Sequence, residues 1–384
     1  MTRKIIKLIP KSNSLFHFGI KGLDETETIF HSDSLFSAII NNYAKINGMV
    51  SIDDKFIKTF PKISSVFHYV EIEKKNNEKY EFIDNIFFIP KPYAKLDVFD
   101  KFPEDDSKKI KKVEFISLGI LKILNNIGGK LDANDMDKYI LSKKYLVSQA
   151  ELKLLGLDNI QSDDKRREQI YKKIKIAELV KEQKVRVNRD FSKDNEPFTE
   201  EHFQMCESEY YIEDTNKNKE YYKIKAGFYF LIEDLDESNE KLLQSIYLIK
   251  DEGLGGERST GKGLFEDIKI DGFDDGLNEI EPNDDKFFVS LSLVFPDVTD
   301  KEYDNAKSFE LIERKGFVYS PFSLVEYRKR IVRMFKEGSI FDKKVKGKIE
   351  TVVKKDKDKF EHNVYRYGKA FLIPILYKGD DEDE

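Results

Sequence analysis

The chain has 384 residues, which is long for one domain and enough for two domains with hydrophobic cores of their own. Its formal net charge is −6, so no overall positive field marks a nucleic-acid-binding protein, although phosphates need only a local basic groove. Cys206 is the single cysteine, which excludes a disulfide framework and a cysteine-based metal site. The first residues lack the apolar run of a signal peptide, and no stretch is long enough to span a membrane. These features predict a cytoplasmic protein without membrane association.

The N-terminal residues predict a strand followed by a helix. Residues 4–9 are rich in isoleucine and read as a strand. In HSDSLFSAIINNYAKI (31–46) the apolar side chains share one helical stripe: Leu35, Phe36, Ile39, Ile40 and Tyr43. The stripe is preceded by His31, Ser32, Asp33 and Ser34, and Ser32 or Asp33 is placed to cap the helix. A second interpretation stays open, in which the free N–H groups and hydroxyls of this helix N-terminus face a phosphate backbone.

The next hundred residues predict a strand and a helical region. FIDNIFFIP (82–90) has the composition of a buried strand that ends at Pro90. Residues 97–107 are polar and predict a loop. Apolar periodicity predicts helices over 113–124, 132–145 and 167–183. We therefore expect a helical insertion over about 95–183, which serves as a lid or a packing element of the first domain.

A basic segment leads into the clearest strand of the chain. Residues 165–189 hold ten Lys or Arg and three Glu, a balance of +7, which is typical of a solvated face. In the following VRVNRDF, Val185 and Val187 alternate with Arg186 and Asn188. YYKIKAGFYFLI (221–232) alternates most regularly and predicts a strand with one apolar face.

GLGGERSTGKGLF (253–265) joins a predicted helix (239–253) to a predicted strand (264–270). Its five glycines allow backbone N–H groups to close on an anion, and its Arg and Lys add positive charge. A flexible surface loop is the plainer interpretation. The string GERSTGKG is close to a P-loop, but Gly263 stands where a hydroxyl must bind magnesium. The order helix, loop, strand is also the reverse of a P-loop or a dinucleotide-binding fingerprint, which argues against a nucleotide triphosphate site.

A second domain is expected after the acidic, turn-rich segment 271–285. Residues 286–296 predict a strand, and 309–320 predict two strands paired around Lys315 and Gly316. Residues 343–359 are rich in lysine and predict an exposed loop or hairpin, and 380–384 form an acidic tail. The five histidines show no metal-ligand spacing, so no metal site is expected.

Two of these motifs, HSDSLFSAI and GLGGERSTGKGLF, resemble the RAMP superfamily of CRISPR proteins, and within it subunit four of type III-A (Csm) effector complexes, a Cas-five-like group. RKRIVRMFKEGSIF and YRYGKAFLIPI resemble the C-terminal signature of that family. The resemblance implies an α+β fold with two ferredoxin-like (RRM-like) domains, 1–284 and 285–384. The first would carry the helical insertion, a thumb hairpin at about 185–222 and the glycine-rich loop 253–263.

The resemblance also implies a function. The chain would be a non-catalytic RNA-binding subunit that caps the 5′ tag of the crRNA and docks the large polymerase-cyclase subunit and a backbone RAMP subunit in antiviral defence. No catalytic residue, metal or cofactor is expected. The expected RNA-binding residues are His31, Ser32, Asp33, Ser34, Arg186, Asn188, Arg189, Gly253, Gly255, Gly256, Glu257, Arg258, Ser259, Thr260, Gly261, Lys262 and Gly263. Phe191 and Phe198 are candidates to wedge or stack against bases.

Two other functions remain to be weighed. The first is a metal-independent endoribonuclease that processes guide precursors, as some RAMP relatives do. It would use His31 as the base and Lys262 or Arg258 to stabilise the oxyanion. The second is a nucleotide-binding regulator that uses Lys262, which the missing P-loop hydroxyl makes the poorest of the three.

Overall fold

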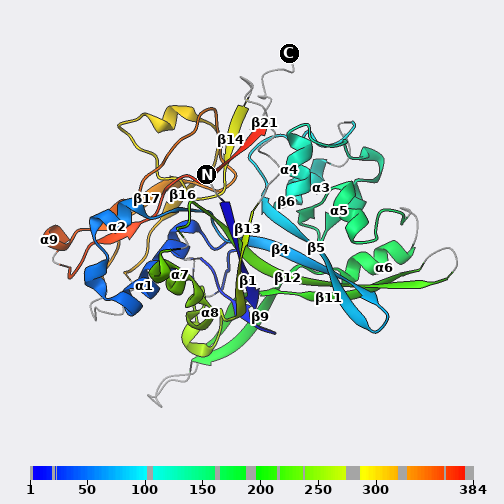
Figure 1. Ribbon diagram of the computed structural model, residues 1–384, viewed down its shortest axis with the longest axis horizontal. Coiled ribbons are helices and arrows are strands. Elements are labelled where there is room, and N and C mark those ends of the chain that lie inside the picture. The colour runs from blue at the N-terminus through cyan, green and yellow to red at the C-terminus, as the bar shows by residue number, and fades with distance from the viewer. Residues whose placement is uncertain are drawn as a thin grey trace.

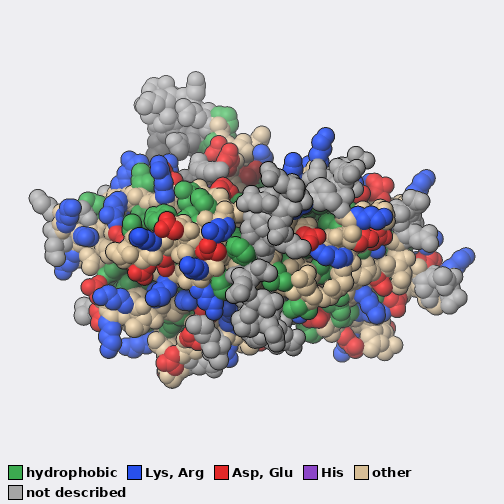
Figure 2. All heavy atoms as spheres, turned by 90° about the horizontal axis from the view of Figure 1, so that it is seen from above, with side chains coloured by type: hydrophobic (Ala, Val, Ile, Leu, Met, Phe, Trp, Pro, Cys, Tyr) green, Lys and Arg blue, Asp and Glu red, His purple; other side chains and the backbone are tan. Residues whose placement is uncertain are grey.

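The computed structural model describes residues 3–19, 22, 24–101, 107–160, 165–186, 196–213, 217–236, 238–273, 286–318, 327–358 and 360–376. Its mixture of sheets and short helices confirms the predicted α+β class (Figure 1). In the described part of the chain, no helix is both long and apolar enough to cross a membrane. Lys and Arg side chains mix with Asp and Glu over the face seen in Figure 2, as the small net charge leads one to expect.

The largest sheet in the described part of the chain has the strand order β13-β1-β12-β4-β5-β6-β8-β7, and β3 and β11 also pair with β12. Its strands are β1 Arg3–Pro10, β3 Lys62–Ile63, β4 Phe67–Asn76, β5 Lys79–Pro90, β6 Phe115–Ser117, β7 Ile140–Leu141, β8 Tyr145–Leu146, β11 Glu207–Glu213, β12 Lys219–Glu233 and β13 Phe265–Gly272. The pairs are antiparallel except for β6 with β8. The strands predicted over 4–9, 82–90, 221–232 and 264–270 are confirmed.

Side-chain alternation along the central strands divides the core between the two faces of this sheet. Phe228 and Phe230 of β12 pack on one face, and Tyr229 and Leu231 pack on the other. The first face is covered by α1 (Ser32–Asn47), α7 (Glu240–Tyr247) and α8 (Ile249–Glu252), which lie together at the left of Figure 1. The predicted helices over 31–46 and 239–253 are thus confirmed, with a break between α7 and α8. In the sequence, η1 (Met49–Ser51) and α2 (Asp54–Thr59) follow α1 and precede β3.

The expected helical insertion contains helices but also extends the sheet. Its helical pieces are α3 Ser107–Lys112, α4 Leu118–Leu124, η2 Ala133–Tyr139, α5 Gln149–Leu154 and α6 Lys165–Lys173. The helix predicted over 113–124 is wrong in its first half, because Phe115–Ser117 pairs with β5 and β8 and the Ser117 hydroxyl caps α4. The helix predicted over 167–183 ends at Lys173, because Ala177–Arg186 is a strand, β9.

A separate sheet carries the predicted thumb region. Strand β9 pairs along its whole length with β10 (Glu196–Met205), which also pairs with β2 (Leu15–Phe16). The hairpin therefore begins at Ala177 rather than near residue 185. The acidic stretch that follows it is β11, an edge of the large sheet, because Glu207–Glu213 pairs with β12. Val187, Asn188, Arg189 and Phe191 lie outside the described residues.

The C-terminal region is built from small sheets. Its elements are β14 Lys286–Ser290, η4 Glu302–Asn305, β15 Ala306–Ser308, β16 Leu311–Arg314, β17 Val332–Phe335, β18 Ile340–Phe341, β19 Glu350–Val353, α9 Lys355–Asp358, β20 Val364–Arg366 and β21 Leu372–Leu376. The strand predicted over 286–296 ends at Ser290. The turn predicted around Lys315 and Gly316 is wrong, since β16 pairs with β17 and an isolated bridge joins Phe317 to Arg328 beyond it. The boundary segment predicted over 271–285 lies mostly outside the described residues.

Candidate functional site

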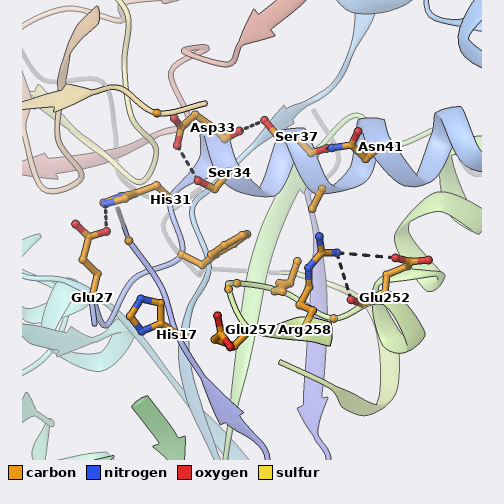
Figure 3. A pocket seen from close by; sticks show the side chains of 18 of the residues that line it. His17, Glu27, His31, Asp33, Ser34, Ser37, Asn41, Glu252, Glu257 and Arg258 are labelled. Atoms are coloured by element: carbon orange, nitrogen blue, oxygen red, sulfur yellow. Dashed lines mark hydrogen bonds and ion pairs between the residues drawn. The ribbon is translucent and has the colours of Figure 1, made fainter. Parts of the chain in front are cut away.

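A cleft of about 790 Å³ lies where α1, the glycine-rich loop and the C-terminal region meet. One wall is the polar face of α1, along which Ser34, Ser37 and Asn41 follow one another (Figure 3). The opposite wall is the glycine-rich loop with Glu257 and Arg258. The C-terminal region contributes Arg314, Lys315, Gly316, Phe317, Lys329 and Arg366. Segments that are far apart in the sequence thus form one site.

Close backbone packing explains several glycines of the loop. Gly253, Gly255, Gly261 and Gly263 all have positive φ, between 72° and 95°. A Cβ on Gly255 would lie 2.5 Å from the carbonyl oxygen of His17, and one on Gly263 would collide with the carbonyl oxygen of Leu254. The N–H groups of Gly256 and Gly263 donate to the carbonyl oxygens of His17 and Leu15, both at 2.8 Å. These contacts fix the loop against β2. The loop also holds the short helix η3 (Arg258–Thr260), preceded by Glu257 in the left-handed region.

Lys262 points away from the cleft and into a buried cluster on the β9–β10 hairpin. Its Nζ lies 2.8 Å from Oε2 of Glu182, 3.4 Å from Oε2 of Glu200 and 2.5 Å from Nε2 of His202. The Lys262 side chain holds the pKa of the Glu182 carboxyl below its usual value. Burial opposes ionisation of Glu200, yet hydrogen bonds from Lys184 and Lys262 still lower its pKa. The ammonium of Lys262 therefore ties the glycine-rich loop to the hairpin.

The ligand atoms of Glu182, Glu200 and His202 lie within 4.8 Å of one another, a spacing that suits a metal ion. Sequence spacing gave no sign of this group, because Glu182 belongs to the opposite strand of the hairpin. In the structure the ammonium of Lys262 takes the place that a cation would occupy.

Arg258 lines the cleft and stays partly exposed. Its Nη1 donates to the backbone oxygen of Glu252 at 3.3 Å and lies 3.9 Å from that residue's Oε2 (Figure 3). The guanidinium thus stands beside α8 at the edge of the cleft, where a phosphate could reach it. Ser259, Thr260 and Gly261 lie on the same turn of the loop, and Thr260 donates its hydroxyl to the backbone oxygen of Glu257 at 2.7 Å.

The start of α1 is buried, and its side chains do not cap the helix as predicted. His31 is the N-cap residue, with extended backbone and no capping side-chain hydrogen bond. The Ser32 hydroxyl instead accepts a hydrogen bond from the N–H of Leu293 at 3.1 Å. Asp33 accepts two from Arg314, at 3.0 and 2.9 Å, and another from Arg366. Although burial opposes ionisation, these two guanidinium groups hold the pKa of the Asp33 carboxyl far below its usual range.

His31 is held between two carboxylates. Its Nδ1 lies 2.9 Å from Oε1 of Glu337 and its Nε2 lies 3.2 Å from Oε2 of Glu27. Burial disfavours the imidazolium, but the two carboxylates outweigh this and raise the pKa of His31 to about 9. At neutral pH the ring therefore carries its proton and positive charge.

Some lining residues were missed from the sequence, and some predicted residues are not described. Ser37 and Asn41 were missed, although they continue from Ser34 at the helical spacings of three and four residues. The cations of the C-terminal region gave no local signal at all. Phe198 is half-buried on β10, whereas the side chain of Arg186 and all of Asn188 and Arg189 lie outside the described part of the chain.

Comparisons with known proteins match one and the same family over most of the chain. Residues 283–375 match the family model of the CRISPR Csm4 C-terminal domain. A Methanocaldococcus jannaschii protein called CRISPR system Cms protein Csm4 is 31% identical over 404 residues, which cover 98% of this chain and 99% of that protein. A Streptococcus thermophilus protein of the same name is 24% identical over 373 residues, covering 94% and 95%. A chain in the crystal structure of a Csm3-Csm4 subcomplex of the type III-A CRISPR-Cas interference complex has a TM-score of 0.59 and 25% identity, covering 98% of this chain and 99% of that chain.

Proposed function

The chain belongs to the Csm4 family of type III-A CRISPR subunits, and from this premise we propose that it is a non-catalytic RNA-binding subunit that holds the 5′ tag of the crRNA. The observation that carries the proposal is the composition of the cleft. Hydroxyl and amide groups of α1, the glycine-rich loop with Arg258, and Lys315 and Lys329 all line it. Such donors suit ribose and phosphate oxygens, which need few base-specific contacts.

The arrangement of the large sheet supports a ferredoxin-like first domain. The strands β13, β1, β12 and β4 lie side by side in that order, with α1 between β1 and β4 in the sequence and α7 between β12 and β13. We infer that the remaining elements of the first 284 residues are additions to this unit, and that the C-terminal region is a second, reduced one. The β9–β10 hairpin is then the thumb.

The proposal that the chain does not cut RNA rests on the state of His31. A general base must be free of its proton near neutral pH and within reach of the attacking hydroxyl. His31 is buried, it is hydrogen-bonded to Glu337 and ion-paired with Glu27, and its pKa is raised to about 9. A ring in this state is a poor base, which disfavours the endoribonuclease alternative. Lys262 is likewise committed to Glu182 and His202 rather than to an oxyanion.

We propose two protein partners, a backbone RAMP subunit and the large polymerase-cyclase subunit. The first is supported by the solved relative, in which Csm4 is paired with Csm3. The second rests on the family premise.

Co-expression with the neighbouring CRISPR subunits and a repeat–spacer array tests the proposal. RNA extracted from the purified complex should share one defined 5′ end that begins in the repeat, and incubation of the complex with repeat RNA should give no cleavage. RNA with scattered 5′ ends would contradict tag binding. Cleavage of repeat RNA that disappears in His31→Ala would contradict the non-catalytic role and favour the endoribonuclease.

A further inference from the structure

Three cations surround a single carboxylate at the base of the cleft. Arg314 and Arg366 both bind Asp33, and Lys329 lies close enough to all three for its pKa to respond to them. The side chains of Arg314 and Arg366 are 3% and 7% exposed. Burial of several like charges in a protein is costly unless counter-ions balance them.

The hydrogen bonds of this cluster are incomplete. Within the described part of the chain, Nη1 of Arg314 and both Nε and Nη2 of Arg366 are buried without a hydrogen-bond partner. Buried guanidinium nitrogens normally find acceptors, so three such atoms in one place leave the positive charge of this cluster incompletely compensated. The cluster lines the same cleft as the first turn of α1, whose N-terminal end carries a partial positive charge.

The sum of the charged side chains in the cluster shows how much negative charge a bound ligand would need to carry. Arg314, Arg366, Lys329 and protonated His31 are four cations, and Asp33, Glu27 and Glu337 are three carboxylates. The surplus is therefore one positive charge. One phosphodiester carries one negative charge and oxygens that match a guanidinium.

We propose that Lys329, Arg314 and Arg366 form a subsite for one phosphate group, with Lys329 as its direct ligand and the two arginines supplying charge from beneath. The assignment of this phosphate to RNA rests on the proposed function, under which the phosphate belongs to the backbone of the guide. Because Asp33 lies on α1 and the three cations lie in the C-terminal region, an occupied subsite would also fasten the two regions together.

The test uses the full chain, a fluorescently labelled single-stranded repeat RNA, and three variants. Lys329→Met removes the charge and keeps the length of the side chain. Lys329→Arg keeps a charge that does not titrate. Lys343→Met is the matched control, because Lys343 is an exposed lysine of the same region that does not line the cleft.

Lys329→Met should weaken RNA binding about tenfold at low salt. It should also make the slope of log K against log salt less steep by about 0.7, which is the value for one phosphate contact on a single strand. Lys343→Met should leave both nearly unchanged. If Lys329→Met binds RNA with the affinity and the salt dependence of the unmodified chain, the subsite is overturned while the proposed function stays intact.

The pH dependence supplies a readout that a purely structural lysine would not give. Burial, followed by the charges of Arg366 and Arg314, lowers the pKa of Lys329 to about 8, with Asp33 opposing. Phosphate binding favours the charged ammonium, so the affinity of the unmodified chain should fall between pH 7 and 9. The affinity of Lys329→Arg should fall much less over that range, and only towards pH 9, where His31 also begins to lose its proton. An equal fall in both chains would contradict the direct role of Lys329.

A second arm identifies the source of the phosphate. Inorganic phosphate, compared with chloride at equal ionic strength, is titrated into the unmodified chain and Lys329→Met while the melting temperature is followed. A rise in the unmodified chain alone would show that the subsite accepts a free phosphate. An effect of Lys329→Met on RNA binding alone would show that it needs a phosphodiester. If the unmodified chain binds no RNA, the proposed function fails, but the titration with inorganic phosphate still tests the subsite. An equal change in the melting temperature of the unmodified chain and Lys329→Met would then overturn the subsite.

Discussion

His31 and Glu337 stand 306 positions apart in the chain, and their side chains meet at 2.9 Å, both buried. His31 begins α1, and Glu337 lies in the turn between β17 and β18. Ser65 donates its hydroxyl to the same carboxylate oxygen of Glu337. The motif that marks the first helix is therefore held by the Glu-Gly-Ser turn of the C-terminal region, and the two parts of the chain depend on each other.

His31→Asn should lower stability in a pH-dependent way. The pKa of His31 is about 9 in the folded chain and about 6.5 when unfolded, so its ion pairs stabilise the fold fully below pH 6.5 and lose this contribution as the pH rises through 9. We expect a loss on the order of 2–3 kcal/mol at pH 6 that shrinks towards pH 9.5. Urea unfolding across this range checks it, with His362→Asn as the control. A loss that does not change with pH would show that the charge of His31 is not what stabilises the junction.

The loop glycines offer a second, paired test. Gly261 and Gly263 both have positive φ, but a Cβ on Gly261 would meet nothing within 4 Å, whereas one on Gly263 would collide with the backbone of Leu254. Gly261→Ala should cost about 1 kcal/mol, the strain of the left-handed backbone alone. Gly263→Ala should cost clearly more and should displace the loop from β2, so that RNA affinity falls too. Thermal unfolding and RNA titration measure both effects. Equal losses would mean that the contact with Leu254 relaxes freely.

The sequence predicted the elements whose signal is local. The apolar stripe of α1 and the alternation of β12 arise from residues that are close together in the sequence, and both elements form as expected. The helix predicted over 113–124 failed because Phe115–Ser117 has helical spacing but finds strand partners in β5 and β8. Such pairing depends on residues that are distant in the chain, so no local pattern reveals it.

The candidate site was predicted in part for the same reason. The motif at the start of α1 and the glycine-rich loop do lie on one cleft. The roles of Asp33 and Lys262 could not be read, because their partners Arg314, Arg366 and Glu182 lie at least 80 positions away. A buried aspartate with two arginines looks, in sequence, the same as a capping aspartate.

The polar face of α1 gives a prediction about RNA affinity. Asn41 lines the cleft, and Asn41→Asp would place a negative charge beside the proposed path of the phosphates. We expect RNA affinity to fall about tenfold at low salt, with a smaller effect at high salt because screening weakens the repulsion. Fluorescence anisotropy at two salt concentrations measures it. Asn77→Asp makes the same change at an exposed turn between β4 and β5, and it should alter affinity little. The cleft would not be the RNA path if the two variants behaved alike.

Replacing Lys262 should convert its cluster into a metal site. Nε2 of His202 lies 3.3 Å from Oε2 of Glu182 and 3.3 Å from Oε2 of Glu200. Three ligand atoms of a tetrahedral zinc ion, each about 2.0–2.2 Å from the metal, stand at about this separation. Lys262→Ala removes the ammonium that fills the position and leaves two close carboxylates without it, so the variant should be less stable than the unmodified chain in the absence of metal.

Zinc should then restore the stability of Lys262→Ala. We expect micromolar Zn²⁺ to raise its melting temperature by several degrees, because an ion that binds only the folded state stabilises it. Lys262→Arg, which keeps a cation in the cluster, should show no such rise, and Co²⁺ should give visible absorption bands in Lys262→Ala alone. If zinc shifts Lys262→Ala and Lys262→Arg equally, the ion binds elsewhere, and Lys262 does not occupy a cation position between the glycine-rich loop and the hairpin.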